Sequence, residues 1–218
     1  MTENLDVLVM ESHRHYADVA STALEEAGHR VHRCYDPEES GFPCRGVTSP
    51  ADCPIDRGVD VALLVRPRVM PHPTPLETGV ACALRAGVPV VEKGTESLDP
   101  FAGWITRRVD GGSVADTCVE AVEAGWASLR ERIERRTLHI VAGTGGPGPI
   151  QSAFERDGRR LRVRLSGPPL GKDTQHAVSI RALDAVRAEG RHFDEIDVSY
   201  TPTAGGNAQP SPSNRDTY

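Results

Sequence analysis

The sequence has almost no lysine and few aromatic residues. Only Lys93 and Lys172 occur among 25 basic residues, aromatic residues make up 5% of the chain, and the formal net charge is −6. Proteins that bind nucleic acid need a broad basic surface, because much of their affinity comes from neutralising phosphates. The acidic balance therefore argues against nucleic acid as a partner.

Long apolar runs are also missing from the chain. No window reaches 18 consecutive apolar residues, so no membrane span is predicted. The first twelve residues, MTENLDVLVMES, lack the basic segment and apolar run of a secretory signal. We therefore expect a soluble, cytoplasmic protein. In a reducing cytosol, cysteines that are close in sequence more often bind metal or do redox chemistry than form structural disulfides.

Short apolar runs alternate with amphipathic segments over residues 1–136. This alternation predicts a parallel sheet covered by helices, a Rossmann- or flavodoxin-like α/β domain. A closing helix from about Ser113 carries Cys118 on its apolar stripe, which favours a packed core thiol there. The expected strands are 6–10, 30–34, 59–65 and 89–91, and the expected helices before the closing one are 14–27 and 76–86.

The pattern changes at Leu138. A strand-like LHIVAG, a hairpin turning at Asp157-Gly158, a helix and a final strand predict a small α+β domain over 137–202. The tail, 203–218, has no apolar face, and we expect it to be disordered. Residues 130–164 hold nine arginines against four acidic residues. Such an excess is typical of a protein partner or self-association through this domain, of docking on the acidic domain, or of a solvated face.

Three of the five cysteines, Cys34, Cys44 and Cys53, fall in one insert, 34–57, that interrupts the α/β pattern. The insert has almost no apolar periodicity, so we expect sulfur chemistry rather than a buried face to fix its shape. Its spacing, C-x9-C-x8-C, matches neither a zinc knuckle nor a ferredoxin motif. Three thiols in one loop predict a site for a zinc ion or an iron–sulfur cluster.

A fourth ligand has to come from outside the insert. Cys82, on the helix after the third strand, is the main candidate, with His32, His72 or an exogenous molecule as alternatives. Two other interpretations stay open. In the first, two of the thiols form a redox-switchable disulfide and no metal is bound. In the second, the cysteines are incidental loop residues.

Polar residues follow the carboxyl ends of the expected strands. Glu11 and His13 come after the first strand and Arg66 after the third. In an open parallel sheet, ligands bind beyond these ends, so the three are candidate cofactor-binding residues. The insert leaves the carboxyl end of the second strand, and we expect it on the same edge. The alternative is that loops at any sheet edge collect polar residues.

Residues 77–90, ETGVACALRAGVPV, resemble the E-x-G-x-A-x-A-L-x-x-G-x-P-V helix of the nucleoside 2-deoxyribosyltransferase-like proteins. The resemblance covers about fourteen residues. It implies a Rossmann-like fold. It also implies that Glu77 is a nucleophile that attacks the anomeric carbon of a sugar and forms a covalent glycosyl intermediate.

Two functional hypotheses follow from these patterns. The first is a metal- or iron–sulfur-binding sensory, regulatory or interaction protein that uses the cysteine insert at the sheet edge. The second is a deoxyribosyltransferase-like N-glycosidase with Glu77 as nucleophile. They differ in what they require of the fold, since the first needs sulfurs close together and the second needs Glu77 in an open pocket.

Overall fold

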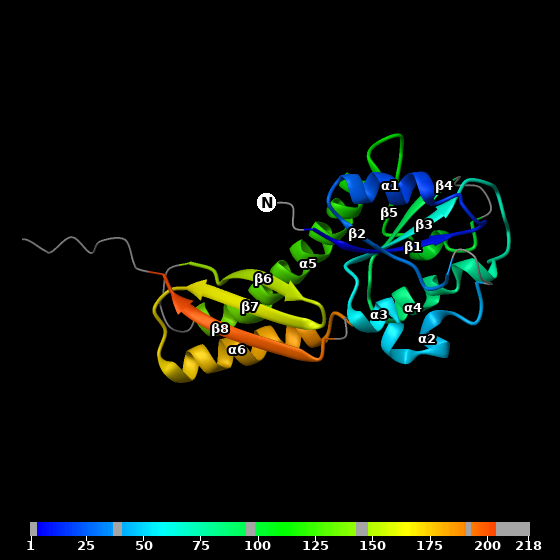
Figure 1. Ribbon diagram of the computed structural model, residues 1–218. Coiled ribbons are helices and arrows are strands. Elements are labelled where there is room, and N and C mark those ends of the chain that lie inside the picture. The colour runs from blue at the N-terminus through cyan, green and yellow to red at the C-terminus, as the bar shows by residue number, and fades with distance from the viewer. Residues whose placement is uncertain (1–3, 37–40, 95–98, 143–147, 191–192, 204–218) are drawn as a thin grey trace, which may run out of the picture.

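The computed structural model describes residues 4–36, 41–94, 99–142, 148–190 and 193–203 (Figure 1). It contains two sheets that share one long helix, α5 (Val114–Ala142). The larger sheet is parallel throughout and has the order β2-β1-β3-β4-β5. Its strands are β1 (Asp6–Glu11), β2 (Arg30–His32), β3 (Val61–Arg66), β4 (Val90–Gly94) and β5 (Arg107–Arg108).

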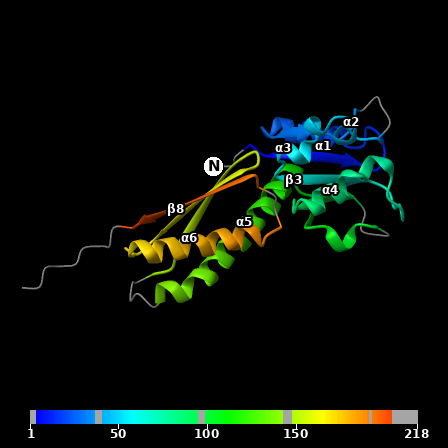
Figure 2. The same ribbon diagram turned by 90° about the horizontal axis from the view of Figure 1, so that it is seen from below.

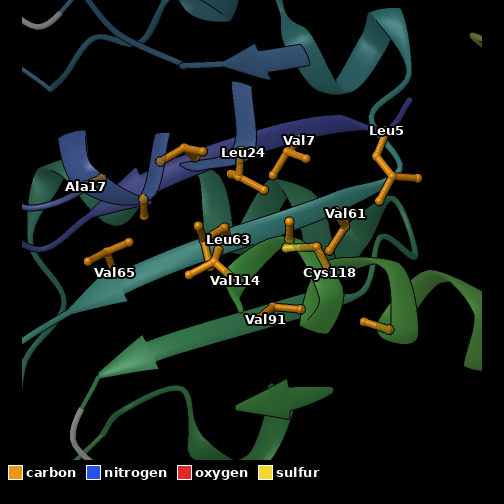
Figure 3. Packing of buried hydrophobic residues seen from close by; sticks show 14 of the residues in the cluster. Leu5, Val7, Ala17, Leu24, Val61, Leu63, Val65, Val91, Val114 and Cys118 are labelled. Atoms are coloured by element: carbon orange, nitrogen blue, oxygen red, sulfur yellow. The ribbon is translucent and has the colours of Figure 1, made fainter. Parts of the chain in front are cut away.

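The α/β character and the parallel sheet confirm the fold class expected from the sequence. The central strands β1 and β3 are continuous apolar runs, as expected of strands buried on both faces. One face packs against α1 (Asp18–Glu26) and the first half of α5 (Figure 3). Cys118 is fully buried in this cluster, which confirms it as a core thiol. The buried positions of α1 are Ala20, Ser21 and Leu24, whereas Val19 is 76% exposed.

The opposite face of the sheet packs against the insert and α4 (Gly79–Arg85). The described part of the insert forms three short helical segments, α2 (Arg45–Thr48), η1 (Pro50–Asp52) and α3 (Pro54–Arg57). The insert was expected to lack a buried face, and this expectation is wrong. Cys34 and Tyr35 are buried, and Cys44 and Ile55 pack against the same apolar cluster. The buried residues of the insert are irregularly spaced in the sequence, so they show neither the periodicity of a helix nor that of a strand.

The insert also does not stay at the carboxyl edge of the sheet, where the sequence placed it. Because β2 and β3 are parallel, the chain between them has to return to the amino end of β3. The insert makes this return across the face of the sheet, in the position of a crossover helix (Figure 1).

The small sheet has the order β6-β7-β8, with an antiparallel hairpin and a parallel third strand. Its elements are β6 (Gln151–Asp157), β7 (Arg160–Gly167), α6 (Lys172–Arg187) and β8 (Glu195–Pro202). Figure 2 shows α5 and α6 side by side, and both contact the sheet. Residues 138–142 were expected to be a strand but belong to α5, because Val141 continues the helical face that packs in this core. Residues 204–218 of the expected tail lie outside the described residues.

Helix α5 crosses the expected domain boundary at residue 136 without a break. Trp126 on this helix contacts the apolar cores of both sheets. The division into two domains therefore stays a prediction. Among the described residues, no helix has the length and apolar character that a membrane span requires.

Candidate metal centre

The structure brings the thiol of Cys34 into the core beneath the insert. Cys34 comes two residues after β2, is 6% exposed, and packs in the cluster that holds Met10 of β1 and Val80 of α4. Its carbonyl accepts a hydrogen bond of 2.7 Å from the backbone N–H of Arg45, which fixes α2 above it. A methyl group added at Gly79 would lie 3.2 Å from Cys34 Sγ, so the glycine lets α4 approach this sulfur closely.

Cys44 and Cys53 occupy equivalent places in the insert. Each is the residue immediately before a short helix, Cys44 before α2 and Cys53 before α3. The two helical segments lie close together, because a methyl group at Gly46 would lie 3.1 Å from Cys53 Sγ. Glycine at this position therefore brings the start of α2 against the second sulfur.

Cys82 lies on α4 and faces the insert. Together with Cys44 and Cys53 it lines a cavity of about 370 Å³ between the insert, α4 and the tip of the small sheet. The remaining wall of the cavity is formed by Gly46, Val47, Ile55, Asp56, Gly58, Val59, Asp60, Arg85, Ala86, Val88, Arg156, Arg159 and Phe193. The insert and α4 thus contribute three thiols to one cavity.

The surroundings of Cys34 keep its thiol protonated. Its pKa is raised to about 12, chiefly by burial and further by the nearby thiols of Cys44, Cys53 and Cys82. Burial also raises the pKa of Cys53. Both thiols are therefore protonated at neutral pH. A thiol at such a site loses its proton only when a metal ion replaces it.

Basic side chains surround the cavity. Arg85, on the last turn of α4, donates a hydrogen bond of 3.6 Å to Cys82 Sγ. Arg156 and Arg159, at the β6–β7 turn, line the opposite side. Sequence reasoning missed these two, and no local signal could have found them, because the turn comes about seventy residues after Arg85 and its position depends on α5.

The cysteines have the chemistry of metal ligands, but their side chains are not close enough together to bind one ion. All five cysteines are free. Within the described ranges, no three cysteine, histidine or acidic side chains already surround a common point as ligands of one ion. The alternative fourth ligands are elsewhere, since His32 pairs with Asp6 at 2.7 Å and His72 is exposed. Soft thiolates suit zinc, copper(I) or an iron–sulfur cluster.

Glu77 does not stand in an open pocket. It is 1% exposed, and its Oε1 pairs with Arg66 Nε at 2.7 Å. Its Oε2 accepts a hydrogen bond of 2.6 Å from the Thr74 N–H, in a capping box that begins η2 (Pro75–Glu77). A carboxylate held on both oxygens cannot reach a sugar, so the structure corrects the nucleophile role. The sequence Thr-x-x-Glu with proline at the first helical position was the signal for this cap.

Two of the three expected cofactor-binding residues also have structural partners. Arg66 is 1% exposed, and besides Glu77 it pairs with Asp99 at 2.8 Å. Glu11 is equally buried and accepts hydrogen bonds of 2.9 Å from both the Tyr35 hydroxyl and the Ala17 N–H. Buried groups satisfied in this way are not free to bind a ligand, which corrects both assignments.

His13 is the third expected cofactor-binding residue, and it is partly exposed at the carboxyl edge of the sheet. It lines a hollow with Tyr16 and Phe42, and its ring lies 5.3 Å from that of Tyr16. Its role stays a prediction. The structure thus separates the sequence candidates into a thiol group on one face and an edge group at the ends of the strands.

Comparisons with known proteins do not assign a family. No protein-family model matches the chain, and no curated protein matches it. Among solved structures, a variant of the MamM CTD aligns with 38% of this chain and 99% of that chain, at 13% sequence identity and a TM-score of 0.26. A likeness at this score carries no functional argument.

Proposed function

We propose that the protein binds a metal centre, a zinc ion or an iron–sulfur cluster, through Cys34, Cys44, Cys53 and Cys82. One observation carries the proposal. Three thiols, two from the insert and one from α4, line one cavity, and the thiol of Cys34 is buried beneath the insert, where burial and then the three thiols raise its pKa. Three of the five cysteines of the chain therefore line one cavity, although Cys82 is 29 residues from Cys53 in the sequence.

The arrangement favours a cluster over a single ion. A zinc ion bonds each sulfur at about 2.3 Å, which would require α2 and α3 to move toward α4. An iron–sulfur cluster occupies a volume of its own and takes thiolates arranged around it. Three of the four thiols line a cavity, and among the described residues no three potential ligands already meet at one point, so we favour a cluster.

The charge around the cavity supports the same proposal. Four thiolates bring four negative charges into a partly buried place, and charges there need partners. Arg85, Arg156 and Arg159 line the wall, and of these Arg156 is paired with Asp60 and Arg159 with Asp56. Burial raises the pKa of Cys34, so uptake of metal by this thiol releases a proton and the affinity depends on pH. A site of this kind suits sensing or regulation.

The test is metal analysis of protein purified under nitrogen, with an absorption spectrum. We expect stoichiometric zinc, or iron and sulfide with visible absorption, and loss of this content in each of the variants Cys34→Ser, Cys44→Ser, Cys53→Ser and Cys82→Ser. The matched control is Cys118→Ala, which removes the remaining thiol from the other face of the sheet and should retain the metal.

Two results would refute the proposal. One is a folded, metal-free and colourless protein that takes up neither zinc nor iron with sulfide on reconstitution. The other is that all four of the single serine variants retain the metal. Alkylation of free thiols followed by mass spectrometry detects the competing chemistry, in which oxidation joins two of these cysteines reversibly and no metal is bound.

A further inference from the structure

The small sheet ends in a long strand that has a neighbour on one side only. Among the described strands, β8 pairs with β7 and with no other (Figure 1). It has eight residues, whereas the edge strands of the large sheet, β2 and β5, have three and two. The other edge of the small sheet, β6, has its end against the large sheet, where Phe154 and Asp157 line a cavity with Asp6 of β1. In the described part of the chain, β8 therefore presents the longest open sheet edge.

The apolar side chains of β8 show that this edge is incompletely covered. The register pairs the core-facing positions of the two strands, Leu161 with Ile196, Val163 with Val198 and Leu165 with Tyr200. The three side chains of β7 are at most 1% exposed, while the three of β8 are only partly buried. Proteins commonly protect a long edge strand with an inward-pointing charge, a proline or a bulge. The core-facing positions of β8 carry no such charge, and its one proline is the last residue, Pro202.

The last bond of the β7–β8 ladder shows which main-chain groups of β8 point outward. The Thr203 N–H donates a hydrogen bond of 2.7 Å to the carbonyl of Gly167, which is paired with Pro202. In a parallel ladder a residue bonds to the two neighbours of its partner, so the odd-numbered residues of β8 bond to β7. The N–H and carbonyl groups of Val198 and of the other even-numbered residues therefore point away from β7. Pro202 lies at such an outward position, where a proline in an edge strand is tolerated.

The exposed face of β8 complements itself when the strand direction is reversed. Its first half carries the acids Glu195 and Asp197, and its second half carries the hydroxyl residues Ser199 and Thr201. Antiparallel pairing of two copies about a two-fold axis at Val198 sets Glu195 opposite Thr201 and Asp197 opposite Ser199 of the second copy. Each acid then faces a hydroxyl donor, and no like charges are directly opposite. An axis at Asp197 would instead place two carboxylates opposite each other.

The axis at Val198 also brings the outward main-chain groups together. Val198 lies opposite its own counterpart, and Ile196 lies opposite Tyr200 in both directions, which gives three pairs. All three belong to the even-numbered set, so each pair can exchange two N–H···O bonds, as in an antiparallel ladder. Both copies use the same strand, so the contact closes at two chains and leaves no edge for a third.

We infer that β8 is a dimerisation edge that pairs antiparallel with β8 of a second copy of this chain about an axis at Val198. The two small sheets then form one continuous sheet of six strands. The added strand covers the core-facing side chains of β8 that are partly buried in one copy. The inference is independent of the proposed metal centre, because none of the residues that line the thiol cavity belongs to β8.

Sedimentation equilibrium of the full chain over a range of concentrations tests the inference. We expect the wild type to reach twice the mass of one chain. Val198→Pro removes the N–H at the axis from both copies but leaves the bonds to β7 in place, so it should raise the dissociation constant at least about tenfold. Val198→Ala is the matched control, since it shortens the same side chain but keeps the N–H. It should stay dimeric at concentrations where Val198→Pro is monomeric, and circular dichroism checks that both variants fold.

A charge exchange tests the register without touching the main chain. Ser199→Asp sets an acid opposite Asp197 at two places in the dimer and should raise the dissociation constant by about fivefold. Adding Asp197→Ser to this variant restores an acid opposite a hydroxyl, and the double variant should recover the wild-type value. Both positions lie on the exposed face, so the fold of one copy does not depend on them.

Hydrogen exchange shows what covers the edge. We expect the amides of Ile196, Val198 and Tyr200 to exchange more slowly as the protein concentration rises through the dissociation constant. A wild type that stays monomeric up to its solubility limit would overturn the inference. So would a dimer that Val198→Pro and Ser199→Asp leave unchanged, because it would form through another surface. Slow exchange of these amides in a monomer would show that another segment of the same chain covers the edge, and this too would overturn it.

Discussion

Glu92, at the carboxyl end of β4, is a buried acid whose titration should control the stability of the fold near neutral pH. Its side chain is fully buried, and Oε2 pairs with Arg108 Nη1 at 2.7 Å. Burial raises its pKa from 4.5 to about 7, with the Asp99 carboxylate adding to the rise and Arg108 only partly offsetting it. Glu92 thus belongs to a buried group of two acids, itself and Asp99, with their arginine partners.

The sign of the pH dependence follows from this shift. Below about pH 4.5 both the folded and the unfolded chain keep the proton on Glu92. Between pH 4.5 and 7 the unfolded chain loses it while the folded chain retains it. The contribution of Glu92 to the free energy of unfolding is therefore fully present at low pH and is lost as pH rises through 7. A shift of this size corresponds to about 3 kcal/mol.

The variant Glu92→Gln carries a neutral side chain of the same shape at every pH. Urea unfolding at intervals from pH 4.5 to 8 should show the variant gaining about 3 kcal/mol on the wild type across this range. Glu120→Gln is the control, because Glu120 forms an exposed pair with Arg107 at 3.3 Å. A difference between Glu92→Gln and the wild type that does not change with pH, or that changes in the opposite direction, would show that Arg108 keeps Glu92 ionised.

Two further substitutions test the packing around the site. Arg66→Met leaves the buried carboxylate of Glu77 without its cation and leaves Asp99 with Arg108 alone, so it should lower the free energy of unfolding by about 3–5 kcal/mol. Urea unfolding measures the loss, and a value below about 1 kcal/mol would contradict the pairing with Glu77. Gly79→Ala places a methyl group 2.7 Å from Met10 Sδ and 3.2 Å from Cys34 Sγ. It should lower the free energy of unfolding by about 1–3 kcal/mol and reduce the metal content. The control is Gly103→Ala, which has open space around it and should change neither.

The strands of the large sheet could be predicted from the sequence, and the start and end of several other elements could not. Continuous apolar runs mark β1 and β3, since a strand buried on both faces excludes polar residues. The segment 138–142 carries the same residue types as a strand, yet it is the last turn of α5. Because Val141 packs in the core of the small sheet as part of the helix, this packing overrides the preference of the segment for a strand.

The chemistry at the strand ends shows a second limit of sequence reasoning. Glu77 and Arg66 each have the residue type of a catalytic or ligand-binding group. The sequence does not show that they pair with each other, because their closeness depends on how the loop after β3 folds back. The capping box at Thr74 was visible in the sequence and pointed to a structural role for Glu77. A local motif that explains a residue should therefore weigh against a distant resemblance.

Cys82 and the cysteines of the insert lie on the same face of the sheet because the crossover connections between parallel strands are right-handed. Connections between parallel strands are right-handed in nearly all proteins. In the order β2-β1-β3-β4-β5, the chain moves outward from β1 to β2 and then back in the opposite direction to β3 and β4. Right-handed crossovers then place α1 on one face and both the insert and α4 on the other, as the two apolar clusters show. Cys82 therefore has to lie on the same face as the insert.

The arginines of the cavity have no such topological cause. Arg156 and Arg159 reach the insert only because α5 continues for 29 residues beneath both sheets and carries the hairpin to the amino end of β3. The thiols are thus fixed by the fold of the parallel sheet, while the basic wall depends on how the small sheet is held.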